Sequence, residues 1–134
     1  MNCLGIPVHY SPMMTAICES RGVWPFKEIW CGPDFPKFPP RIQQAFLLHE
    51  AGHCKLFHVE WPILNLWRLV YHPLWATYIR FQELQADYFV KECGYGRDLA
   101  HGFGMIAPPS EELSKLELAC YPDRDERIAR LLEA

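Results

Sequence analysis

The sequence predicts an α+β fold that is mostly helical and carries a small N-terminal β-sheet. Three observations lead to this prediction. The first forty residues hold short apolar runs broken by Gly and Pro, whereas from Arg41 onward apolar residues recur every three or four positions. In addition, half of the 134 residues are hydrophobic and 14% are aromatic, which is enough for a packed core. We therefore expect a single domain over 1–134, strand-rich in 1–40 and helical in 41–134.

Two strands and the turn between them are predicted in the N-terminal part. The composition of residues 14–18 and 27–31 favours extended structure, and a turn containing Gly and Pro over 21–25 would join them. Gly32 ends the second strand, and the prolines that follow keep the chain extended as far as Pro40. Proline suits the first position of a helix, so we expect a helix to start there.

A long helix is predicted from residue 41 to a stop at Trp61 and Pro62. Proline cannot continue a helix, because it lacks the backbone N–H and clashes with the preceding turn. The apolar residues of this segment recur at helical spacing and would form one wide face. That face consists of Ile42, Ala45, Phe46, His49, Gly52, His53, Leu56 and Phe57.

Further helices are expected downstream. A short helix would end near Tyr71, and a longer one would run from Pro73 to a stop at Cys93 and Gly94, where glycine favours a helix end. Residues 102–109 are predicted to be a loop.

The C-terminal part is predicted to hold two more helix starts. Ser110 is followed by two glutamates, which suit a helix N-terminus. Pro122 would begin the last helix, whose apolar side is formed by Ile128, Leu131 and Leu132.

Charge and cysteine content limit the classes of partner and compartment. The net charge is −3 and the 13 Lys and Arg residues are scattered, so the chain lacks the basic stripe of a nucleic-acid-binding protein. The six cysteines include no Cys-x-x-Cys pair, and residues 1–7 show neither part of a signal peptide. We therefore expect reduced thiols and a cytoplasmic protein that does not bind nucleic acid.

Residues 61–81 are the most membrane-like segment. They are rich in Leu, Trp and Tyr, but charged and polar residues and a proline interrupt them: Asn65, Arg68, His72, Pro73 and Arg80. A membrane-spanning helix needs roughly 20 nearly uninterrupted apolar residues. The sequence therefore predicts no transmembrane helix and leaves peripheral contact with a membrane surface open.

The motif His-Glu-Ala-Gly-His at 49–53 carries the chemistry. Residues four apart on a helix project side by side, so His49 and His53 can bind one zinc ion at about 2.0–2.1 Å each. Glu50 can reach a water on that ion. Zinc lowers the pKa of such a water toward about 7, and Glu50 would act as the general base that removes its proton during attack on a carbonyl.

Glu83 is the predicted third ligand. It lies on the downstream helix, and the thirty residues after His53 are enough chain to bring that helix beside the first. Three protein ligands leave the fourth position for water, as a catalytic zinc site requires. Asp87 lies four residues further on and would accept a hydrogen bond from a ligand imidazole, most simply that of His49. We expect one Zn²⁺ ion and a zinc-dependent endopeptidase.

These motifs resemble those of the gluzincin metallopeptidases. His-Glu-x-x-His followed by Glu-Leu-Gln-Ala-Asp at 83–87 is most similar to the branch that holds the HtpX-like and CAAX-processing membrane peptidases and their small soluble relatives, the minigluzincins. Residues 122–128 resemble the C-terminal His-Pro-x-x-x-x-Arg-Ile element of that branch. The resemblance implies a zincin-like domain with a small sheet, an active-site helix, and an edge strand that aligns the substrate.

Two residues of the C-terminal element are assigned from the resemblance. Tyr121 stands where the family has His, and its phenol could either donate to the oxyanion of the tetrahedral intermediate or serve in packing. Arg127 matches a family position near the active site and could instead pair with an acid on a neighbouring helix.

The substrate strand is assigned from position. Peptidases commonly bind an extended substrate as an added strand, through backbone hydrogen bonds. The candidate is Glu28, Ile29, Trp30 and Cys31, immediately before the active-site helix. The alternative is an ordinary core strand.

Two rival functions stay open. The histidine motif with Gln82 and Glu83 also resembles the ImmA/IrrE-type peptidases that cleave repressors, although residues 88–92 lack the Met-Pro pair that usually follows. A zinc-stabilised binding domain without turnover is the other rival. Glu50 argues against it, because a structural site needs a fourth protein ligand and not a base.

Overall fold

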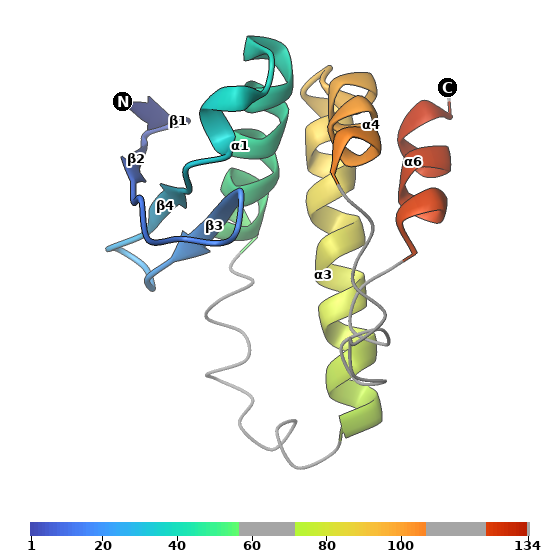
Figure 1. The fold of residues 1–134 in the computed structure, drawn as a ribbon. Coiled ribbons are helices and arrows are strands. Elements are labelled where there is room, and N and C mark those ends of the chain that lie inside the picture. Colours follow the sequence, from blue (N-terminus) through green and yellow to red (C-terminus); the bar gives the residue numbers. More distant parts are fainter. Residues whose placement is uncertain (57–71, 107–122, 134) are drawn as a thin grey trace.

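The computed structural model describes residues 1–56, 72–106 and 123–133 (Figure 1). Within these ranges it is α+β, with a small sheet and four α-helices, so the predicted fold class is confirmed. The elements are β1 (Asn2–Cys3), β2 (Ile6–Tyr10), β3 (Cys18–Arg21), β4 (Glu28–Cys31), the 3₁₀ turn η1 (Phe35–Lys37), α1 (Pro40–Lys55), α3 (His72–Glu92), α4 (Gly96–Met105) and α6 (Arg124–Leu132).

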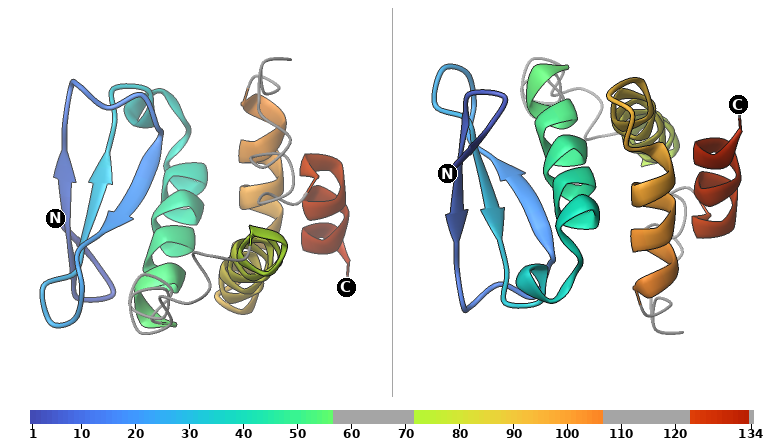
Figure 2. Two further views of the ribbon diagram at one scale, coloured as in Figure 1. Left: turned by 90° about the horizontal axis from the view of Figure 1, so that it is seen from below. Right: turned by 90° about the horizontal axis from the view of Figure 1, so that it is seen from above.

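The layers stack in one direction. Figure 2 shows the sheet on one side of α1, then α3 and α4 on the other side of α1, and α6 outermost. Side chains from the sheet, α1, α3, α4 and α6 form one buried core, which includes Val8, Ile29, Leu48, Val90, Leu99 and Leu131. Helix α1 therefore lies between the strand layer and the other helices, and it contacts elements on both of its sides.

The sheet has the strand order β1-β2-β4-β3. Strands β1 and β2 pair antiparallel, β2 and β4 pair parallel, and β3 and β4 pair antiparallel. Alternate residues of β4 point to opposite faces, so Ile29 and Cys31 are fully buried, whereas Trp30 on the other face stacks on His9 with ring centroids 4.8 Å apart. The order places β4 inside the sheet and β3 at an edge.

The predicted strands are partly right. Strand β4 agrees with the prediction at 27–31, but the strand predicted at 14–18 is wrong, because the paired segment is Cys18–Arg21. Strands β1 and β2 were not predicted. An edge strand tolerates polar residues on both faces, so the sequence Cys-Glu-Ser-Arg of β3 lacks the apolar alternation that signals a strand.

Helix α1 begins at Pro40 as predicted and ends earlier than predicted, at Lys55. The backbone N–H of Leu56 bonds back to the carbonyls of Gly52 and Cys54, which closes the last turn. The predicted stop at Trp61 and Pro62 and the short helix ending near Tyr71 lie outside the described residues.

Helix α3 agrees with the prediction, since it covers His72–Glu92 and is followed by Gly94 at φ +86°. Helix α4 was not predicted: the predicted loop at 102–109 is wrong for residues 102–105, which are helical. Gly102 is not a helix breaker here. A Cβ at this position would lie 2.7 Å from Phe46, so glycine allows α4 to pack closely on α1.

Helix α6 begins at Arg124, close to the predicted Pro122, and Asp123 caps it by accepting from the Glu126 N–H at 3.3 Å. Leu131 is buried and Ile128 packs against the core, but Leu132 is 50% exposed, so its place on the apolar side is wrong. The helix start predicted at Ser110 lies outside the described residues.

In the described part of the chain, no helix has the length and hydropathy needed to cross a membrane.

Candidate metal centre

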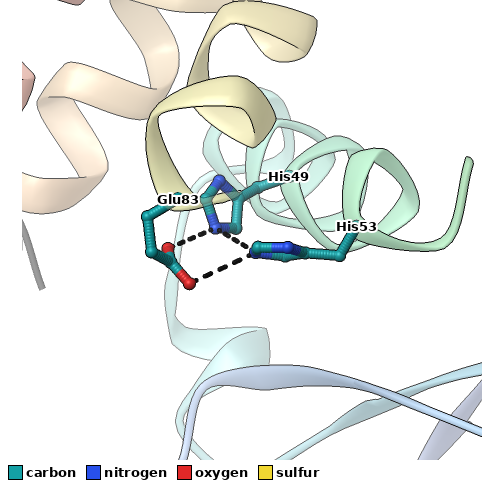
Figure 3. A group of neighbouring side chains, drawn as sticks. All are labelled: His49, His53 and Glu83. Carbon is teal, nitrogen blue, oxygen red and sulfur yellow. Dashed lines mark hydrogen bonds and ion pairs between the residues drawn. The ribbon is translucent and has the colours of Figure 1, made fainter. Parts of the chain in front are cut away.

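The three predicted ligands meet at one point between α1 and α3 (Figure 3). The Nε2 atoms of His49 and His53 lie 3.2 Å apart. Glu83 Oε2 lies 3.1 Å from His49 Nε2, and its Oε1 lies 3.3 Å from His53 Nε2. Both histidines are buried, and the side chain of Glu83 is 15% exposed. Residues separated by thirty positions or more in the sequence are thus brought together.

The α-helical spacing and small residues explain this meeting. His49 and His53 are four residues apart in α1 and therefore share one face. Gly52, on the side of α1 that faces α3, touches Phe89: a Cβ at this glycine would lie 3.2 Å from the ring. Ala51 and Ala86 are fully buried. These small side chains allow α3 to approach closely enough for the carboxylate of Glu83 to reach both imidazoles.

Asp87 lies behind His49, as predicted. Its Oδ1 is 3.0 Å from His49 Nδ1, which is ion-pair distance. The two atoms do not have the alignment of a regular hydrogen bond, so Nδ1 has no hydrogen-bond partner in the described structure. At this distance Asp87 is the group placed to receive the Nδ1 proton.

Arg127 of α6 holds both carboxylates of α3. Its Nε donates to Asp87 Oδ2 at 2.7 Å, and its Nη2 donates to Asp87 Oδ1 at 2.8 Å and to Glu83 Oε2 at 3.3 Å. The guanidinium also lies over the ring of Phe103 in α4, 4.3 Å from the centroid. The side chain is only 12% exposed. Arg127 therefore lies next to the site, as the resemblance implies. It also pairs with an acid on a neighbouring helix, which was the alternative role.

The electrostatics of the site favour a positive charge among its ligands. Burial alone would lower the pKa of His49, but the neighbouring carboxylates of Asp87 and Glu83 outweigh it and raise that pKa to about 10. Burial alone would raise the pKa of Glu83 and of Asp87, but both pKa values are lowered overall. The imidazoles lower the pKa of Glu83, and Arg127 with His49 lowers that of Asp87.

Glu50 is not one of the three ligands. The residue is partly buried, and desolvation of its carboxyl group raises its pKa above the usual range, although His49 and His53 act in the opposite direction. It also accepts a hydrogen bond from the backbone N–H of Ser20 in β3. Glu50 therefore lies between the imidazoles and the edge of the sheet, and its pKa is shifted in the direction that a general base requires.

The predicted substrate strand requires a correction. Glu28–Cys31 is β4, which is paired with β2 on one side and with β3 on the other, so it offers no free edge. The edge beside α1 belongs to β3. The Gly32 N–H bonds to the Ile17 carbonyl, and this register turns the N–H groups of Cys18 and Ser20 away from β4.

The ligand set fits zinc. Two imidazoles and one carboxylate are donors that zinc prefers, and ligand atoms at about 2.0–2.1 Å from a tetrahedral ion lie roughly 3.3 Å from one another. The observed separations of 3.1, 3.2 and 3.3 Å are close to that value, with one carboxylate oxygen of Glu83 facing His49 and the other facing His53. Within the described ranges no fourth His, Cys, Asp or Glu belongs to this group.

Comparisons of the chain with protein-family models, with curated proteins and with solved structures found no match. The resemblance to gluzincins therefore rests on the motif residues alone. The remaining predicted site residue, Tyr121, lies outside the described residues.

Sequence reasoning missed three residues that shape the site: Ser20, Gly52 and Phe103. Gly52 falls inside the histidine motif, where a residue without a side chain could have signalled close contact with a second helix. Ser20 acts through its backbone, and Phe103 lies in a helix that was not predicted. Neither has a signal in the sequence.

Proposed function

We propose, as a first step, that this protein belongs to the class of metal-dependent hydrolases. The observation that carries this proposal is the close approach of the ligand atoms of His49, His53 and Glu83, with no fourth ligand of this kind among the residues that the structure describes. Helix α1 also places Glu50 next to the same imidazoles. A structural zinc site needs four protein ligands and no base, so this arrangement favours catalysis.

As a second step, we propose a zinc-dependent endopeptidase. A bound zinc ion would lower the pKa of a coordinated water toward about 7 and polarise the scissile carbonyl. Glu50 takes a proton at its carboxylate as the carbonyl carbon is attacked, and then donates it to the leaving amine. Asp87 and Arg127 act one step away, since they hold His49 and Glu83 in the orientation that ligation needs.

The edge of β3 is the proposed position of the substrate. An extended peptide added there would form backbone hydrogen bonds with groups that face away from β4, such as the Cys18 N–H. The Ser20 N–H on the same edge donates to Glu50. Substrate bound along this edge would therefore have its backbone next to the general base.

The test separates metal binding from turnover. We expect the purified chain to hold zinc near one equivalent and to cleave an unstructured protein such as casein. Glu50→Gln should keep the zinc and lose at least about 100-fold in cleavage rate, the low end of what a general base contributes. Glu92→Gln, at the exposed end of α3, is the matched control and should change neither property.

A second variant tests the third ligand. Glu83→Ala should fold, as judged by circular dichroism, and should lose zinc on dialysis under conditions in which the wild type retains it. Retention of one equivalent of zinc by Glu83→Ala would refute the ligand assignment. A wild-type protein that holds zinc but cleaves no substrate, with Glu50→Gln indistinguishable from it, would favour the binding domain without turnover.

A further inference from the structure

Two thiols face each other across the strand pair at the edge of the sheet. Cys18 in β3 and Cys31 in β4 are direct partners in the antiparallel register, and their sulfur atoms lie 3.1 Å apart. The other described cysteines are Cys3, Cys54 and Cys93. The Cys18 and Cys31 thiols are in direct hydrogen-bond contact.

The register at this position suits a covalent bond. Because the adjacent pair, Gly32 and Ile17, shares a backbone hydrogen bond, Cys18 and Cys31 form a non-hydrogen-bonded pair. In such pairs the Cα atoms are about 4.5 Å apart, inside the range of roughly 4.4–6.8 Å found in disulfides. The two sulfur atoms would have to approach by about 1 Å to reach the S–S bond length of about 2.05 Å.

We propose that Cys18 and Cys31 form a reversible disulfide by exchange with a low-molecular-weight disulfide such as oxidised glutathione. Cys18 is partly exposed and Cys31 is fully buried, so the first exchange takes place at Cys18. The Cys18 thiolate attacks one glutathione sulfur, and a mixed disulfide forms as one glutathione thiolate leaves. The Cys31 thiolate then attacks Cys18, and the second glutathione leaves.

The exchange balances in electrons and protons. Two electrons pass from the cysteine pair to glutathione disulfide, and the two protons lost by the cysteines are taken up by the two released glutathione thiolates. The hydrogen bond to Cys31, together with burial, raises the pKa of Cys18 above its usual value. Thiolate at Cys18, the more exposed of the two, is therefore scarce at neutral pH, and we expect slow exchange that has to be followed to equilibrium.

This site goes beyond the proposed peptidase function and does not depend on it. The disulfide would fasten β3 to β4 two residues from Ser20, whose N–H bonds to Glu50. The readout below is covalent, so it gives the same answer whether or not the protein cleaves peptides.

The test uses the full chain equilibrated for many hours with glutathione buffers of increasing oxidised fraction. After acid quenching, unfolding and alkylation of the remaining thiols, we expect two alkyl groups fewer per chain in the oxidising buffers. Trypsin should then release peptides 1–21 and 28–37 as one linked species. Cys3 shares the first peptide, so fragmentation of the linked species must assign the bond to Cys18.

Matched variants complete the design. Cys93→Ser, at an exposed cysteine, should leave the linked species unchanged, whereas Cys18→Ser should abolish it. The proposal is overturned if Cys18 and Cys31 are both alkylated in the most oxidising buffer. It is equally overturned if Cys31 is found linked to Cys3, or if Cys18 accumulates as a stable mixed disulfide with glutathione. The wild-type peptide map decides this without reliance on the folding of any variant.

Discussion

The two sides of the candidate metal centre are held in place by different means. On the α1 side, His49 and His53 are neighbours because of helical spacing, and the sheet and α3 fix the helix between them. On the α3 side, Glu83 and Asp87 are also four residues apart, but two buried carboxylates next to each other repel. They are stable together because Arg127 donates to both and His49, whose pKa they raise to about 10, lies at ion-pair distance from both.

This difference indicates where the site is robust and where it is vulnerable. The imidazole side depends on local structure, which any intact α1 provides. The carboxylate side depends on a cation supplied by α6, forty residues after Asp87. Substitutions on the carboxylate side should therefore affect both the fold and the metal affinity, and the following predictions test this asymmetry.

The largest effect is expected for Arg127→Ala. The change removes the guanidinium that pairs with both carboxylates and leaves His49 as the cation beside them, and removal of one partner of a buried ion pair costs about 3–5 kcal/mol. Urea denaturation of the metal-free protein should show this loss in the free energy of unfolding. Arg80→Ala breaks the partly exposed pair with Glu126 between the same two helices and should cost under about 1 kcal/mol. Equal losses in the two variants would show that the carboxylates of the site depend no more on Arg127 than the surface of α3 depends on Arg80.

The stability of the metal-free protein should fall as the pH rises from 7 to 9. The pKa of His49 is raised to about 10 from an ordinary value of 6.5, so the folded state holds a proton that the unfolded state has released. Its contribution is complete below pH 6.5 and is lost as the pH approaches 10, with a slope of about 1.4 kcal/mol per pH unit. The raised pKa of Glu50 acts in the same direction.

Denaturation with a chelator present, at pH 7, 8 and 9, measures this slope. The variant His49→Gln should lose most of it, and a wild-type slope near zero would contradict the shifted pKa. Zinc affinity should change in the opposite sense. Because the metal displaces the His49 proton, affinity should rise about tenfold per pH unit for each proton released.

Asp87→Asn should weaken zinc binding without removing a ligand. The amide cannot replace the charge that orients His49, and loss of such an outer partner typically costs 10–100-fold in metal affinity. Competition with a chromophoric chelator measures the change. Asp98→Asn, which breaks the ion pair between α4 and Arg41 of α1, is the matched control and should leave affinity unaltered. An unchanged affinity in Asp87→Asn would assign Asp87 to folding alone.

The smallest effect is expected for Asp123→Ala. Asp123 caps α6 through the N–H of Glu126, and loss of an N-cap side chain costs about 1 kcal/mol. Thermal and urea denaturation should show this loss. Zinc affinity should stay at the wild-type value, because the cap does not contact the carboxylates. A parallel loss of zinc would show that the position of α6, and not only the charge of Arg127, determines the site.

The helical part of the molecule was far more predictable than the sheet. The period of apolar residues and the prolines indicated α1 and α3, and the spacing of His49, His53 and Glu83 indicated a common site, because side-chain periodicity in a helix is a local property. Strand β3 and the helix α4 were missed. Their positions depend on partners: β3 pairs with β4, and Gly102 packs on α1.

The same contrast applies to individual site residues. Asp87 was predicted beside His49 because both lie on regular helices that face each other. The edge position was assigned to the wrong strand, since strand order in a sheet follows from pairing across the chain and not from the distance of a strand to the motif. Strand β4 pairs with β2 on one side and with β3 on the other, so β3 forms the edge of the sheet.

The position of Arg127 has a consequence for the order in which the site forms during synthesis. The ribosome adds the histidines first, the acids next and the guanidinium last. Until α6 has emerged, the nascent protein holds Glu83 and Asp87 near each other without the guanidinium that pairs with both. The acids are therefore expected to stay hydrated until α6 has emerged, and α3 is expected to dock fully on α1 only after that.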